Sequence, residues 1–187
     1  MKHHPRLKGS LRRVLMELNN CILKRRAFNK LVSLKAAHGL NFFRVAAAAL
    51  QNDLYAGAHR ALEMHQDSAS FWYIRNIAPA LIDRAAEKSG ISLAELEKLA
   101  AKLKPIRDQI HSHVDRSAID DPDKPWKEAN LTGNEFIWLT ESAHEVLRQA
   151  LLELTNEDSA VPSYDGDDIE LIIRAYKKEH PNAPVSI

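Results

Sequence analysis

Apolar residues recur at intervals of three and four along most of the chain. One such run begins at Leu11 and continues through Val14, Leu15, Leu18 and Ile22. This spacing draws one apolar stripe along an α-helix, and no segment shows the strict every-second-residue alternation of a strand. The pattern therefore predicts an all-α protein, a bundle of about five to six helices around a four-helix core, in which each helix buries its stripe.

The same spacing places the expected helices along the chain. They cover residues 11–37, 42–64, 70–90, 92–114, 135–154 and 168–180. Glycine at 90 is expected to close the third helix, and capping boxes at Ser92–Glu95 and Thr132–Glu135 open the next two. A polar, proline-bearing loop is expected over 115–131, and a tail over 156–187 that ends in the short last helix.

Two prolines should interrupt the helical pattern. Pro79 is expected to bend or split the third helix. Pro105 should kink the fourth, because its ring displaces the carbonyl four residues earlier.

Length and charge limit the function classes. The 187 residues fit a single domain over 1–187, and a net charge of +1 excludes a generally basic nucleic-acid coat. The only cysteine, Cys21, cannot form an intramolecular disulfide, which suits a reducing cytosol. No apolar run approaches the roughly 20 residues that a membrane span needs. A cytoplasmic protein without membrane contact is therefore expected.

The stretch KLKPIRDQIHSHVD, residues 102–115, carries the candidate chemistry. On a helical wheel Arg107 falls inside the apolar stripe, about 20° from Leu96. A charge on a buried stripe needs an anion, water or a partner, because burying it alone costs several kcal/mol. His113 lies at the edge of the same stripe but about 9 Å farther along the axis. Arg107 and His113 would reach one phosphate if two copies of the helix met at a two-fold axis, or if the helix unwound after Ile110.

The run Arg107–Asp108, four residues, then His113 resembles the signature of the HEPN superfamily (higher eukaryotes and prokaryotes nucleotide-binding domains). LKPIRDQIHSHVD is similar to its abortive-infection, U-type branch, and so is the earlier stretch ALQNDLYAGAHRALEMHQDSASFWYI, which includes Arg60. The resemblance covers residues 40–155. His111 leaves too few intervening residues to match, and Ser112 stands where the branch often has alanine.

The resemblance implies a HEPN-like bundle that dimerises through the motif helices and cuts RNA without a metal or other cofactor. His113 would transfer protons, Arg107 would hold the phosphate, and Asp108 would orient Arg107 or a histidine of the partner. The products would end in a 2′,3′-cyclic phosphate. It also implies a toxin or defence effector of an abortive-infection or toxin–antitoxin system, with a homodimer, an RNA substrate and an antitoxin protein as partners.

Other interpretations stay open. Arg107 would equally suit a structural ion pair with a carboxylate from another helix. His113 would suit the C-terminal end of a helix, where its cation interacts favourably with the helix dipole. His111, His113 and Asp115 would also offer metal ligands. However, His111 and His113 are two residues apart on a helix, so their rings point to different faces. Arg60 would line the cleft or form a salt bridge, and Trp126 would stack on a base or anchor its loop.

Two alternative functions follow from the same motif. One is a non-catalytic HEPN module that binds RNA or a nucleotide in the same cleft. For the ribonuclease and for this module alike, Arg60, His111 and Trp126 are the further candidates for substrate contacts. The other is a helical interaction protein in which the motif holds only the dimer together.

Overall fold

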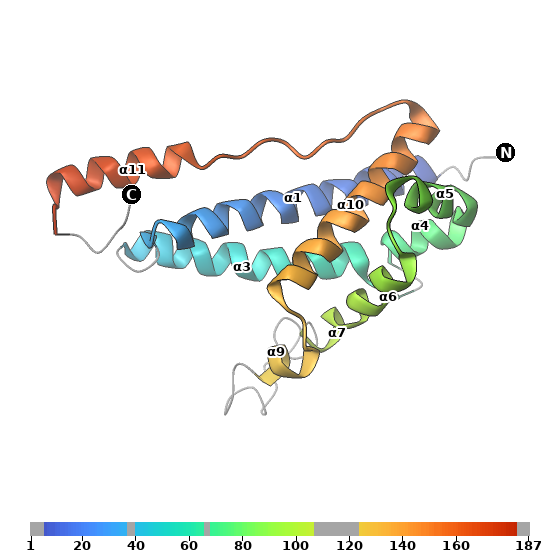
Figure 1. Ribbon diagram of the computed structural model, residues 1–187, viewed down its shortest axis with the longest axis horizontal. Helices are drawn as coiled ribbons and strands as arrows, with labels where there is room; N and C mark the ends of the chain where they lie inside the picture. The colour runs from blue at the N-terminus through green and yellow to red at the C-terminus, as the bar shows by residue number, and fades with distance from the viewer. Residues whose placement is uncertain (1–5, 37–39, 66–67, 107–123, 183–187) are drawn as a thin grey trace. The chain divides into compact units, whose positions relative to one another are not determined.

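The computed structural model describes residues 6–36, 40–65, 68–106 and 124–182, and the regular elements in these ranges are α-helices (Figure 1). The long helices are α1 (Leu7–Ser33), α3 (Asn41–Leu62) and α10 (Gly133–Thr155). The shorter ones are α4 (Phe71–Ile77), α5 (Pro79–Ser89), α6 (Leu93–Ala101), α7 (Leu103–Ile106), α9 (Lys124–Ala129) and α11 (Asp167–Glu179). The prediction of an all-α protein is confirmed for this part of the chain.

Backbone contacts divide the chain into two compact units. The first comprises Met1–Asn19 and Tyr55–Ala160, and the second Asn20–Leu54 and Val161–Ile187. The helices α1 and α3 contribute residues to both units. The single domain expected over 1–187 stays a prediction.

The first unit is a helical bundle built on α10, which packs against α5 and α6 (Figure 1). Leu139 and Leu147 on α10 are fully buried, as are Ile82 on α5 and Leu96 on α6. Burying an aliphatic side chain of this size contributes about 1.5–3 kcal/mol. The stripes that the sequence spacing predicted therefore form the core of this unit.

Local signals place the helix boundaries in the first unit. The predicted capping box at Thr132 is confirmed. The Thr132 amide donates to Glu135 Oε2 at 2.7 Å, and the Glu135 amide donates to Thr132 Oγ1 at 3.2 Å. Ser92 accepts from the Glu95 amide at 3.3 Å. Gly90 closes α5 with a φ of 65°, a left-handed conformation that suits glycine.

Both prolines interrupt helices as expected. Pro79 begins α5 and so splits the predicted third helix at Ala78. The predicted fourth helix breaks at Lys102, between α6 and α7. This break follows from Pro105, which cannot donate to the carbonyl of Ala101 and whose ring crowds that oxygen.

One predicted loop is wrong in part. The segment expected as an irregular loop over 115–131 contains the helix α9 over Lys124–Ala129. Pro125 is compatible with it, because a proline at the start of a helix removes an amide that has no intrahelical partner.

The second unit consists of residues 20–33 of α1, residues 41–54 of α3, and α11, with their flanking segments. Its core includes Leu31, Phe43, Ile169 and Ile173, all buried. The α11 residues are four apart and so share one face of the helix. An ion pair between Lys30 and Glu170 fastens α11 to α1.

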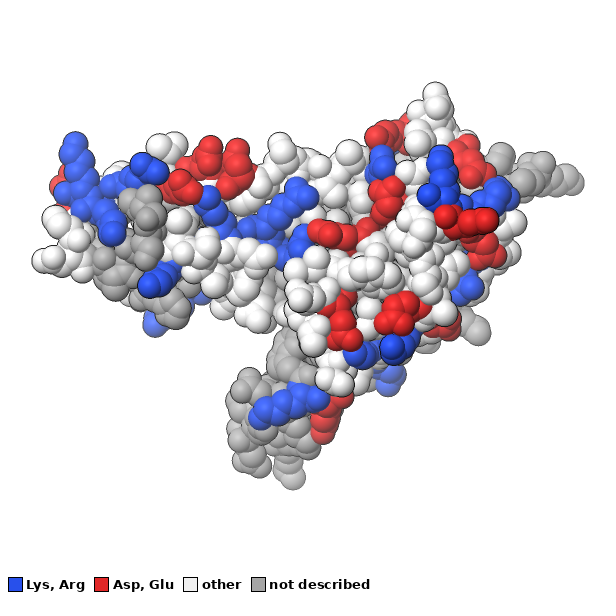
Figure 2. Space-filling model, viewed as in Figure 1, with Lys and Arg blue, Asp and Glu red and all other residues white. Residues whose placement is uncertain are grey.

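Both basic and acidic side chains are present on the visible surface. Figure 2 shows Lys and Arg beside Asp and Glu over part of this face. The ion pairs of the first unit include that between Arg84 and Glu153, at 2.6 Å. Glu157 accepts from both Lys8, at 2.9 Å, and Arg12, at 2.6 Å. Among the described residues no helix is both long and apolar enough to cross a membrane.

Candidate functional site

The residues predicted to carry the chemistry are only partly described. Arg107, Asp108, His111 and His113 lie outside the described residues, as does the alternative metal ligand Asp115. Their roles therefore stay predictions. The described residues show how the two ends of the segment that carries them are held.

Short helices flank this segment on both sides. Arg107 directly follows α7, and α9 begins at Lys124. The two helices pack against each other within the first unit. Leu103 and Ile106 on α7 and Ala129 on α9 are buried. The apolar contact between α7 and α9 thus anchors both ends of the motif segment, residues 107–123.

Lys102 joins the same two flanks through polar contacts. Its Nζ donates to the carbonyl oxygen of Asn130 at 2.6 Å and to Glu135 Oε1 at 2.9 Å. The bond from Lys102, together with that from the Thr132 amide, lowers the pKa of Glu135 to about 2. The residue at the break before α7 therefore holds both the end of α9 and the start of α10.

Trp126 belongs to α9, but its side chain lies outside the described part of the structure. Both interpretations of Trp126, a stacking platform and an anchor for its loop, stay predictions. Its backbone is placed on a helix and not in the irregular loop expected from the sequence.

Arg60 lies on α3 in the first unit, with its side chain about half exposed at 52%. Its Nη2 donates to Glu17 Oε2 at 3.2 Å, while Arg13 donates to Glu17 Oε1 at 3.3 Å. The salt bridge that the sequence left as an alternative is present. A contact with substrate stays a prediction for Arg60. Glu17, which shares its carboxylate between the two arginines, gave no signal in the sequence pattern.

A pocket of about 330 Å³ opens where α3 ends. Its lining includes His59 and Leu62 from α3, and Glu63, Met64 and His65 from the chain just beyond the helix. Leu62 is buried, whereas His65 and Met64 are exposed. This part of the lining thus combines the apolar side chains of Leu62 and Met64 with two imidazoles and a carboxylate.

The rest of the described lining comes from the α6–α7 junction, through Ala100, Ala101 and Lys104. We name this cavity, bounded by these three residues and by residues 59 and 62–65, the α3–α7 pocket. The two alanines leave the space that larger side chains would occupy. Lys104, which is exposed, stands three residues before Arg107.

The end of α3 at this pocket is held by an aromatic side chain. Trp72 is buried on α4, and its indole Nε1 donates to the carbonyl oxygen of Leu62 at 3.0 Å. Arg75 lies over the same indole, 5.7 Å from the ring centroid. One of the last carbonyls of α3 is therefore satisfied by the protein. The sequence could not reveal this pocket, because its lining comes from segments about 40 residues apart.

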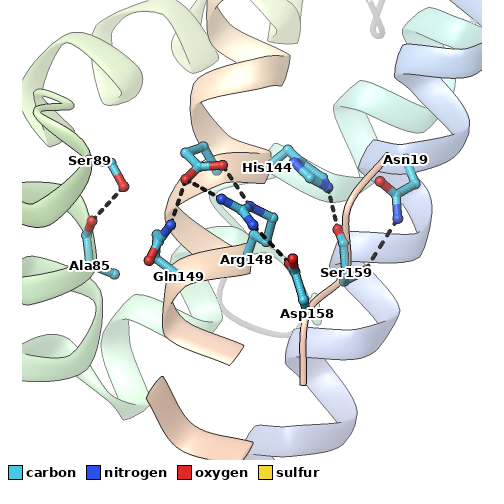
Figure 3. A network of polar contacts seen from close by, with 9 residues as sticks. Asn19, Ala85, Ser89, His144, Arg148, Gln149, Asp158 and Ser159 are labelled. Atoms are coloured by element: carbon cyan, nitrogen blue, oxygen red, sulfur yellow. Dashed lines mark hydrogen bonds and ion pairs between the residues drawn. The ribbon is translucent and has the colours of Figure 1, made fainter. Parts of the chain in front are cut away.

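A separate polar network fastens the chain after α10 (Figure 3). His144 Nε2 lies 3.1 Å from the Ser159 carbonyl oxygen, and Arg148 bridges Glu145 and Asp158 at 2.8 Å each. Burial lowers the pKa of His144, so the ring is neutral near pH 7 and its Nε2–H donates to Ser159. These contacts hold the segment after α10 against the first unit, which is a structural role.

Within the described residues, no group of three or more histidine, cysteine, aspartate or glutamate side chains is arranged to hold a metal ion. The histidines and the carboxylate of the α3–α7 pocket do not form such a group.

No protein-family model, curated protein or solved structure matches the chain. The likeness of residues 102–115 to the HEPN signature therefore stays a resemblance of sequence. What the described residues establish is an all-α chain in which α7, α9 and Lys102 hold both ends of the segment that carries it.

Proposed function

We propose that the chain is a metal-independent endoribonuclease of the HEPN type, with Arg107 and His113 as its central residues. The observation that carries the proposal is the run from Arg107–Asp108 to His113, set in the longer similarity over residues 40–155. An all-α chain is compatible with it, and the anchored flanks at α7 and α9 support it. A reactive arrangement needs side chains fixed by rigid neighbours.

In this proposal His113 moves a proton between the ribose 2′-hydroxyl and the leaving oxygen. An imidazole with an ordinary pKa of about 6.5 suits both directions near neutral pH. Arg107 binds the phosphate with two parallel hydrogen bonds and stabilises the charge that builds on it. Asp108 orients Arg107 or a histidine across the two-fold axis. No protein-bound metal is required for these steps.

The decisive experiment measures RNA cutting by the purified full chain with a metal chelator present. We expect cutting that leaves 2′,3′-cyclic phosphate ends, and a loss of at least about a hundredfold in His113→Ala. His111→Ala is the matched control, because this ring is two residues away and does not fit the signature. Unchanged cutting by His113→Ala would reject the assignment.

The two-chain site has its own test. Arg107→Ala and His113→Ala chains are mixed under conditions that exchange subunits. If one chain supplies Arg107 and the other His113, about a quarter of the wild-type activity returns, because half of the dimers are mixed and half of their sites are intact. No recovery would place both residues in one chain, and a monomer by sedimentation would exclude a site built from two copies.

We further propose that the chain acts in the cytoplasm as the toxin or defence effector of an abortive-infection or toxin–antitoxin system. Growth arrest on expression of the intact chain, relieved in His113→Ala, is the expected result. RNA binding that falls in Arg107→Ala, without cutting by any form, would instead favour the non-catalytic module. Altered association alone, with no nucleic-acid phenotype, would favour the helical interaction protein.

A further inference from the structure

We propose that the outward face of α11 binds α11 of a second copy of this chain, with the two helices antiparallel across a two-fold axis. The face is formed by Asp168, Leu171, Ala175 and Lys178, and all four residues are exposed. We name it the outer α11 face. The contact goes beyond the proposed function, because it lies in the second unit and uses no residue of the motif segment.

The second unit leaves large apolar side chains uncovered. The inward side of α11 packs into the core of the unit through Ile169 and Ile173, which are buried. On the outward side, Leu171 is 68% exposed and Ile172 is 52% exposed. Most of the exposed large apolar side chains in the described part of the chain belong to this unit: Val32, Phe42, Val45, Leu171 and Ile172. Apolar residues on both sides of a helix are typical of an element with a further packing partner.

The distribution of charge along α11 favours a second copy that runs in the opposite direction. The first turn of the helix holds Asp167, Asp168 and Glu170, and the last turn holds Lys177 and Lys178. Two such helices in antiparallel contact bring the acidic start of each beside the basic end of the other. A parallel pair would bring like charges together at both ends. The helix is therefore complementary to its own copy in the antiparallel direction.

The spacing of the four residues fits one register. At about 100° per residue, they lie within about 40° of one line along the helix. In an antiparallel pair centred on the level of Ile173, Leu171 faces Ala175 of the second copy and Asp168 faces its Lys178, because both pairs are symmetric about that level. A large side chain against a small one allows close packing. The two-fold axis repeats each contact, which gives two apolar contacts and two charge pairs.

The edges of the outer α11 face are compatible with this register. Ile172 of each copy lies on the same edge, close to the axis, so the two side chains meet. Arg174 lies on the other edge near its own copy, but each Arg174 pairs with Glu170 of its own chain at 3.7 Å. Asp167 and Glu179 reach equal levels on opposite edges and do not meet. No like charges are therefore brought together without a neutralising partner.

The size of the contact sets the expected affinity. The helix has 13 residues and is about 20 Å long, so an α11 pair lies at the small, transient end of protein interfaces. We expect a dissociation constant of about 10–100 μM. Sedimentation equilibrium of the full chain from about 1 μM to 1 mM covers this range. The mass should double across it, from monomer to dimer, or from dimer to tetramer if the motif helices also pair.

The first variant removes the apolar contact. Leu171→Gln should weaken this association at least about tenfold, because each pair of chains buries the side chain twice. Glutamine keeps nearly the helix propensity of leucine, and the position is exposed, so the fold should be retained. Met16→Gln, at a position on α1 that is 47% exposed, is the control and should associate as the wild type does. An unchanged mass in Leu171→Gln across the whole range would overturn the inference.

The second experiment reverses charges. Asp168→Lys and Lys178→Asp each place like charges opposite one another in a pair of identical chains, so each should weaken self-association at least about fivefold. The two variants mixed together should associate, because a chain with two lysines then meets a chain with two aspartates. The double variant should also recover association, since its charge pairs are only reversed. Loss of helix in a single variant would not produce this recovery, and its absence in both cases would overturn the inference.

Other outcomes separate this contact from a different occupant and from the proposed function. Anionic lipid vesicles that retain the wild-type chain but not Leu171→Gln, with no self-association by either form, would assign the face to a membrane surface and overturn the inference. RNA cutting without any association that Leu171→Gln weakens would leave the ribonuclease intact and reject the contact. Association that Leu171→Gln weakens, without cutting by any form, would support the contact and contradict the proposed function.

Discussion

Lys102 and Glu135 are 33 positions apart in the sequence, and the lysine Nζ lies 2.9 Å from Glu135 Oε1. The contact closes a loop that contains α7, the motif segment and α9. Lys102 also holds the Asn130 carbonyl oxygen, at 2.6 Å. One side chain therefore fixes the two ends of the stretch from which the proposed activity arises, and closing such a loop opposes chain entropy.

The first prediction concerns acid. Because the pKa of Glu135 falls from 4.5 to about 2 on folding, its contribution to stability is present above pH 4.5 and is lost as the pH falls toward about 2. Lys102→Met should weaken this loss, since the lysine is the largest cause of the shift. Urea unfolding across this pH range measures it. Lys98→Met, which removes only a contact with Glu95 three residues away, should keep the wild-type acid dependence.

The second prediction concerns His144. Burial lowers its pKa, so the unfolded chain binds a proton more readily than the folded one. Its contribution to stability is therefore present above about pH 6.5 and is lost as the pH falls below that value. The neighbouring Glu145, Asp158 and Arg148 modify this effect without reversing it. Thermal unfolding as a function of pH should show the loss.

His144→Gln tests this assignment. Glutamine keeps a donor for the Ser159 carbonyl oxygen but binds no proton in this range, so the slope of stability against pH between neutrality and mild acid should flatten. His180→Gln is the matched control, because this ring is exposed on the second unit. An unchanged slope in His144→Gln would assign the pH dependence to other groups.

The third prediction compares two glycines. Gly166 caps the start of α11 with a φ of 75°, and an added Cβ would meet Lys30 Cγ at 2.5 Å. Gly166→Ala should destabilise the protein by about 1–2 kcal/mol. Gly9 lies within α1 with nothing within 4 Å of its Cβ position, so Gly9→Ala should stabilise it by about 1 kcal/mol. Chemical denaturation should give opposite signs, and equal signs would contradict the backbone argument.

The fourth prediction separates the two roles of Arg60. If Arg60 contacts substrate, Arg60→Gln should weaken RNA binding by about fivefold to tenfold, the loss of one charge-assisted contact. Arg13→Gln is the control, because Arg13 shares the same Glu17 carboxylate and is similarly exposed. Binding is measured in the His113→Ala background, which prevents cutting. Equal effects of the two substitutions would leave Arg60 with the salt bridge alone.

Local features were predictable from the sequence because neighbouring residues create them. The all-α class, the Thr132–Glu135 capping box and the breaks that Pro79 and Pro105 impose follow from hydrogen bonding and sterics within a few positions. The helix α9 was missed, because its six residues are too few to show an apolar repeat.

The motif that indicates a function could also be recognised in the sequence, because a resemblance depends only on residue identity and spacing. Tertiary structure alone decided which distant residues meet: Lys102 with Glu135, Arg60 with Glu17, and α3 with the α6–α7 junction around a pocket. Spacing tells which face of a helix is buried but not which other helix covers it. That choice depends on packing across the whole unit.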